Sequence, residues 1–235
     1  MLMHAALAVL MYRMGSGSDV LIGTPVAGRF EPELQRVVGM FVNTLALRST
    51  LDPAASFTEL LSSIRESDLE ALAHVDVPFD DVVSAVNPQR VPGRHPLFQV
   101  ALSVHDWSET SLGGNLDAGA GLLAQVTEVD TESVKFDLQF TVTGINPGAE
   151  GQARIKMTYA RARYDQRTAE AISARLIRVL RAVTDSPTMP VATRRSPISS
   201  RRPPWPRCAV CPPRSRDHWW SCSPRRSTTI PTAPR

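Results

Sequence analysis

The chain has 235 residues and is poor in cysteine, in lysine and in long apolar runs. Its three cysteines all lie at or after Cys208, so the residues before Cys208 have no disulfide framework, and a cytoplasmic setting is the simplest expectation. No run of about 18 apolar residues occurs, which predicts no membrane-spanning helix and no membrane partner. The apolar start, residues 1–14, lacks the basic region and the cleavage site of a signal peptide, and favours an amphipathic core helix with Leu2, Ala6, Val9 and Leu10 on one face.

Several catalytic and nucleotide-binding motifs are absent as well. The sequence has no G-x-S-x-G elbow, no P-loop and no G-x-G-x-x-G. GTPVAGR at residues 23–29 favours a loop that ends a strand over a phosphate site. The pairs His74/Asp76 and His105/Asp106 could orient a general base, but a helix cap and a surface turn explain them better. The residues by themselves predict no catalytic site.

The formal charge of +3 is an average over two unlike regions. Residues 186–235 hold ten Arg and one acidic residue, a charge of +9, whereas residues 1–185 hold 16 basic and 22 acidic residues, a charge of −6. The basic tail has few large apolar residues and many prolines, so we expect residues 186–235 to be disordered. The acidic body argues against a nucleic-acid partner.

The tail also contains four potential zinc ligands, Cys208, Cys211, His218 and Cys222. Their spacing is similar to a zinc knuckle with a longer middle gap. Structural zinc sites need a supporting fold. An accidental cluster is therefore the favoured interpretation, and no metal site is predicted.

Residues 1–185 alternate helix and strand patterns, which predicts an α/β domain. Ser56 and Glu59 form a capping box at the start of a helix, and Pro25 is expected to end the first strand. A Gly-rich stretch at 112–121 is expected to be a loop. The patterns predict helices over 2–14, 56–72, 78–86 and 165–183, and strands over 19–24, 39–48, 98–104, 136–142 and 153–159.

Four segments in order carry a family resemblance: IGTPVAGR (22–29), VGMFVNTLALR (38–48), HVDVPFDDVV (74–83) and RVPGRHPLFQV (90–100). With KFDL (135–138) and the helix after Tyr164 and Asp165, residues 1–185 resemble the condensation domains of nonribosomal peptide synthetases. The resemblance implies a chloramphenicol acetyltransferase-like fold, in which two α/β halves enclose a tunnel. Peptidyl carrier proteins insert 4′-phosphopantetheine arms into this tunnel, and the acceptor amine attacks the donor thioester.

The catalytic signature of that family, HHxxxDG, is missing here, because the sequence contains no His-His pair. The resemblance therefore implies only the C-terminal half of the domain, a mixed sheet flanked by helices, with no catalytic residue and no directly bound cofactor. Phe41, Asn43, Thr44 and Arg29 are the candidates for the substrate channel. For Asn43, the alternative is a polar residue that satisfies backbone groups. The other family-motif residues are expected to be structural: Gly23, Gly28, Gly39, Arg48, His74, Asp76, Pro78, Phe79, Arg94, Pro96 and Leu97.

The resemblance leaves two functional hypotheses. The chain is part of a peptide-bond-forming domain that needs its N-terminal half, carrier proteins and an adenylation domain, and is inactive alone. Alternatively, it is a non-catalytic module that docks carrier proteins or complements a split condensation domain. The tail departs from the family, and its Arg, Pro and Ser content suggests a gene read out of frame.

Overall fold

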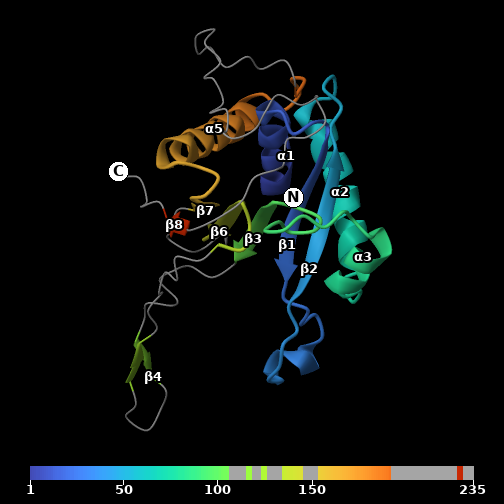
Figure 1. Ribbon diagram of the computed structural model, residues 1–235, viewed down its shortest axis with the longest axis vertical. Coiled ribbons are helices and arrows are strands. Elements are labelled where there is room, and N and C mark those ends of the chain that lie inside the picture. Colours follow the sequence, from blue (N-terminus) through green and yellow to red (C-terminus); the bar gives the residue numbers. More distant parts are fainter. Residues whose placement is uncertain (106–114, 118–122, 126–133, 145–152, 192–226, 230–235) are drawn as a thin grey trace.

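The computed structural model describes residues 1–105, 134–144 and 153–191 in full, and only the backbone of 115–117, 123–125 and 227–229. Its centre is a mixed sheet with the strand order β2-β1-β3-β6-β7-β8 (Figure 1). β1 and β2 are antiparallel, β3 runs parallel to β1 and β6, and β7 is antiparallel to β6. The strands are β1 (Asp19–Val26), β2 (Asn43–Thr50), β3 (Val100–His105), β6 (Leu138–Thr143), β7 (Arg154–Ala160) and β8 (Ser227–Thr229), with β4 (Asn115–Asp117) and β5 (Leu123–Gln125) as a separate pair.

Three helices pack side by side over the sheet, and a fourth lies beyond β2 (Figure 1). The three are α1 (Leu2–Met14), α2 (Phe57–Ala73) and α5 (Gln166–Asp185). The fourth, α3 (Phe79–Val86), contacts β2, and the 3-10 helix η1 (Pro32–Arg36) lies in the loop between β1 and β2. The predicted α/β class and the flanked mixed sheet are confirmed. No helix in the described ranges is long and apolar enough to cross a membrane.

The starts of α2 and α5 follow their capping residues. The Ser56 hydroxyl accepts from the Glu59 amide while the Glu59 carboxylate accepts from the Ser56 amide, which confirms the capping box. Asp165 caps α5 in the same way by accepting from the Thr168 amide at 2.7 Å. The apolar face of α5 is buried except for Leu180, which is half-buried, and on α2 the apolar face ends early, since Leu72 is exposed.

The first helix differs from its predicted pattern. We expected an amphipathic helix with Leu2 on the buried face, but Leu2 is 45% exposed and every residue from His4 to Met11 is buried. The helix is enclosed because α2, α5 and β1 all contact it. Its rotational setting therefore cannot be read from an apolar stripe.

Two strand boundaries also differ. β1 continues through Pro25 to Val26, because β1 pairs with β3 only at Gly23 and its end forms an edge on that side, where proline is tolerated. β2 begins at Asn43 rather than Gly39. The preceding carbonyls, including that of Gly39, accept hydrogen bonds from the Arg29 side chain, which holds the segment as a loop.

The packed part of the chain extends past the predicted domain end at Asp185. Val191 is buried, its amide donates to the Ala55 carbonyl at 2.9 Å, and its carbonyl accepts from the Arg13 guanidinium at 2.7 Å. Thr58 also donates to the Pro187 carbonyl. Residues 186–191 therefore pack against the body, beyond Asp185, where the domain was expected to end. The tail after residue 191, with its possible zinc ligands, lies outside the described residues except for strand β8, and of the Gly-rich stretch only residues 115–117 are described.

Candidate functional site

Asn43 is the first residue of β2, and its side-chain amide is fully engaged by the protein itself. Its Nδ2 donates to the carbonyls of Val75 and Val77, each at 2.7 Å. Its Oδ1 accepts from the backbone amides of Thr44, at 2.8 Å, and Phe79, at 3.2 Å. An amide has two donor hydrogens and two acceptor lone pairs, so no hydrogen-bonding capacity is left for a substrate. These four contacts favour the stated alternative, that Asn43 is a polar residue that satisfies backbone groups.

Arg29 organises the loop between β1 and β2. Its guanidinium donates to the carbonyls of Leu34, of Val37 at 2.7 Å and of Gly39 at 3.1 Å, and it lies 4.3 Å from the centre of the Phe41 ring. The charge is therefore held by the loop itself rather than directed at a ligand. The structure thus brings the predicted channel residues Arg29 and Phe41 together, and they contact each other in a cation–π interaction.

At two positions of the predicted motifs, steric crowding explains why the residue is glycine. Gly28 has φ +64°, and a Cβ there would lie 2.0 Å from the Phe41 carbonyl oxygen. At Gly23 a Cβ would lie 1.9 Å from the Phe98 ring. Only glycine allows the Phe41 carbonyl to approach position 28, and the Phe98 ring to approach position 23, this closely.

Phe98 belongs to a cluster of rings that includes His95, which the sequence analysis treated only as part of a motif. The His95 ring centre lies 4.0 Å from that of Phe98 and 5.2 Å from those of Phe79 and Phe136. Burial lowers the pKa of His95, against a smaller opposing effect of the Phe98 backbone. Asn43 fixes the backbone of Phe79, so the predicted FVNT and RHPLF motifs are linked through these rings.

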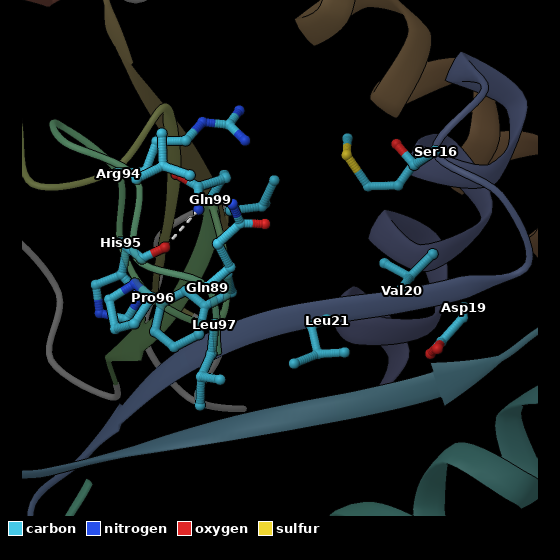
Figure 2. A pocket seen from close by; sticks show the side chains of 14 residues that line it. Ser16, Asp19, Val20, Leu21, Gln89, Arg94, His95, Pro96, Leu97 and Gln99 are labelled. Atoms are coloured by element: carbon cyan, nitrogen blue, oxygen red, sulfur yellow. Dashed lines mark hydrogen bonds between the residues drawn. The ribbon is translucent and has the colours of Figure 1, made fainter. Parts of the chain in front are cut away.

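A cavity of about 320 Å³ lies between the start of β1 and the segment that leads into β3 (Figure 2). Ser16, Val20 and Leu21 form one wall, and residues 94–100 form the other. The Gln99 side chain donates to the His95 carbonyl at 2.7 Å and stiffens the second wall. The cavity-lining residues Leu21 and Val100 come just before the single position at which β1 and β3 pair, Gly23 and Ala101. None of the four predicted channel residues lines it.

A buried charged cluster next to β6 and β7 was not predicted. The Arg163 Nε donates to the Asp137 Oδ1 at 2.7 Å, and the Asp137 Oδ2 is buried and has no hydrogen-bond partner among the described residues. Burial raises the pKa of Asp137, with Arg163 and Arg94 acting against it. Burial also raises the pKa of Tyr164 to about 12 and lowers that of Arg94. Asp137 stood inside the KFDL segment, but nothing local indicated that its partner is 26 positions away.

A second buried cluster has the composition of a hydrolase triad. The Ser49 Oγ lies 2.9 Å from His4 Nε2, and His4 Nδ1 lies 2.9 Å from Asp68 Oδ1. However, His4, Ser49 and Asp68 are only 1%, 4% and 6% exposed, and none lines the cavity. A nucleophile must reach its substrate, so this cluster is structural. The search for His–carboxylate pairs close in sequence missed it, because its members lie on α1, β2 and α2.

Thr44 is half-buried within β2, and the other remaining predicted residues lie on the surface or in turns. Arg48 forms a two-bond ion pair with Asp19, at 2.8 and 2.9 Å, which lowers the pKa of Asp19. His74 is the exposed C-cap of α2, and Pro78 is the N-cap residue of α3, where its side chain accepts no hydrogen bond. The described residues contain no group of three His, Cys, Asp or Glu side chains able to hold a metal ion.

Comparison with known proteins explains why these motifs occur together. The family model for the condensation domain matches residues 1–200. The chain is 40% identical over 193 residues to the "Probable non-canonical nonribosomal peptide synthetase (NRPS) CymA" of Salinispora arenicola, covering 82% of this chain and 2% of that protein. Among solved structures, the X-domain from teicoplanin biosynthesis in complex with OxyB gives a TM-score of 0.71 at 28% identity, covering 82% of this chain and 41% of that chain.

A third similar protein shows the same partial coverage. The starter condensation domain of rhizomide synthetase RzmA gives a TM-score of 0.65 at 26% identity, covering 82% of this chain and 44% of that chain. The chain thus spans less than half of each solved domain and a small fraction of the synthetase. The match over residues 1–200 covers most of the sequence, and the chain belongs to the condensation domain family of nonribosomal peptide synthetases.

Proposed function

We propose that this chain supplies the C-terminal half of a condensation domain, which forms an amide bond between a donor thioester and an acceptor amine on carrier proteins. The single observation that supports this is the family match over residues 1–200. In this proposal the residues of this chain are inactive alone, and the half of the domain that carries HHxxxDG completes the site. The 4′-phosphopantetheine groups belong to the carrier proteins and are not bound permanently.

In this proposal, the role of the C-terminal half is to position the two tethered reactants. Thioesters are activated acyl donors, and two tethered reactants held in a water-poor channel react at a high effective concentration. The residues described above suit this task, because they fix loops and walls: Asn43 holds the start of α3, and Arg29 holds the loop between β1 and β2. None of them needs to exchange a proton with the substrate.

The loop between β1 and β2 supports the need for a second half. Its side chains Phe30, Val38 and Met40 are 63%, 99% and 86% exposed. Clustered large apolar side chains at a surface are typical of a covered interface. We assign this interface to the half that carries HHxxxDG.

The test is to express the chain together with a polypeptide carrying the HHxxxDG half and to supply loaded donor and acceptor carrier proteins. Mass spectrometry should detect the amide product only when both polypeptides are present. Each half alone and the pair carrying Asn43→Ala are the controls, and the latter should form less product because the start of α3 is released. A stable pair that yields no product would contradict the proposal.

A second candidate is a non-catalytic docking module, and one observation favours it. The similar X-domain was solved in complex with OxyB, so a domain of this fold can serve as a binding partner. A chain of this class would bind carrier proteins without forming product. Size-exclusion chromatography with carrier proteins, in the absence of the HHxxxDG half, distinguishes the two, since docking alone predicts a complex there.

A further inference from the structure

The buried cluster of Ser49, His4 and Asp68 joins three elements of the body. His4 lies in the first turn of α1, Ser49 on β2 and Asp68 in the second half of α2. Both ring nitrogens of His4 are used, one by each partner at 2.9 Å. The Ser49 hydroxyl can donate to His4 Nε2, while the Asp68 carboxylate accepts from His4 Nδ1.

Within the buried run of the helix that carries His4, only His4 makes polar side-chain contacts that define the rotation of the helix, and Arg13 in the last turn adds a contact to the Val191 carbonyl. His4 is the only polar residue in the buried run from His4 to Met11, and all other side chains there are Ala, Leu, Val or Met. A helix that is apolar on every side gains comparable burial at several rotations about its axis. Only one rotation places His4 between Ser49 and Asp68, and any other leaves buried polar groups without partners, which is costly.

We propose that the Ser49–His4–Asp68 cluster is a conformational lock that fixes the rotation of α1 about its axis. Buried polar groups are known to specify register in otherwise uniform apolar interfaces. The lock has a consequence at the other end of the helix, where Met11 and the following Ser16 line the cavity between β1 and β3. The same contacts that fix α1 therefore also hold one wall of that cavity.

Three variants of the whole chain separate the lock from plain stability. His4→Gln keeps one donor for Asp68 and one acceptor for Ser49. His4→Leu leaves the Asp68 carboxylate buried without its partner. The triple variant His4→Leu, Ser49→Ala, Asp68→Leu replaces the whole cluster by apolar groups, a change that often restores stability. Ser63→Ala, at an exposed position of α2, is the control.

The readouts are the folding equilibrium in urea and methyl NMR spectra of the α1 methionines Met3, Met11 and Met14. His4→Leu should lower the folding constant about a hundredfold, and the triple variant should return to within about tenfold of the parent. The parent, His4→Gln and Ser63→Ala should each give one set of methionine signals. The triple variant should give several sets or broadened signals, because α1 then occupies more than one rotation.

Two results would overturn the proposal. One is a triple variant with a single sharp set of methionine signals at the positions of the parent, which would show that apolar packing alone fixes α1. The other is a His4→Leu variant with an unchanged folding constant and unchanged signals. A triple variant that fails to fold would likewise count against the lock, since the lock predicts that stability returns while the single rotation of α1 is lost.

Discussion

Two buried polar clusters lie within this small body, and they differ in how completely they are satisfied. In the Ser49–His4–Asp68 cluster both ring nitrogens of the central His4 have partners. In the cluster around Asp137, one carboxylate oxygen binds Arg163 while the other is buried without a hydrogen-bond partner among the described residues. In the first cluster the hydrogen bonds of the central side chain are complete, whereas the second depends on compensation of the Asp137 charge. The two should therefore respond differently to mutation and to pH.

The largest effect is expected from Arg163→Leu. This change leaves the Asp137 carboxylate buried without its hydrogen-bonded cation, which should lower the free energy of unfolding by about 3 kcal/mol, the lower end for a broken buried pair because Arg94 still acts on Asp137. Urea denaturation at neutral pH measures the change. Arg161→Leu, two residues earlier and exposed, is the matched control and should change the free energy by less than about 0.5 kcal/mol. Equal losses in both variants would contradict a special role for the Asp137 cluster.

A smaller loss is expected in the other cluster from Ser49→Ala. It removes one hydrogen bond and leaves His4 Nε2 buried without a partner, at a cost of about 1–3 kcal/mol in the free energy of unfolding. Ser62→Ala, on the exposed side of α2, also removes a hydroxyl hydrogen bond but leaves no buried group without a partner. Thermal or urea denaturation of the two variants should differ by more than about 1 kcal/mol. If both variants lose the same free energy of unfolding, then burial of the Ser49–His4–Asp68 cluster does not determine how much its hydrogen bonds contribute to stability.

The contrast between the clusters also shows what a sequence can predict here. The capping residues Ser56 and Asp165 and the alternation along β6 depend on neighbours a few positions apart, and the structure confirms them. The resemblance indicated the correct family, since its motifs are contiguous segments. By contrast, His4 and Asp68 are separated by 64 positions, and no local pattern connects them.

The candidate site shows the same division. The sequence identified Asn43 as a polar residue of interest. Its side chain contacts the backbone carbonyls of Val75 and Val77, and because every residue has such a carbonyl, the residue types do not indicate these contacts. Pro25 was expected to end β1 by a general rule for proline, and only the limited pairing of β1 with β3 explains why it does not. Each feature that the sequence did not predict therefore depends on contacts between residues far apart in the sequence.

The smallest and most specific effect concerns pH. Burial raises the pKa of Asp137 in the folded protein above that of the unfolded chain, so the folded state binds this proton more tightly. Its contribution to stability is then fully present below the unfolded pKa, near pH 4, and is lost as the pH rises through the folded pKa. Asp137→Asn has no such proton. Relative to the parent, the free energy of unfolding of the variant should therefore be lower near pH 4 than at pH 7. Urea denaturation of both proteins at the two pH values measures this difference.

The control for this prediction is Asp165→Asn, because the sign is opposite there. Hydrogen bonds from Thr168 lower the pKa of Asp165, so its contribution is present above the unfolded pKa and is lost as the pH falls through the folded pKa. Relative to the parent, the free energy of unfolding of Asp165→Asn should be lower at pH 7 than near pH 4. If Asp137→Asn behaves like Asp165→Asn, the ion pair with Arg163 outweighs burial, and the Asp137 cluster is as well satisfied as the cluster around His4.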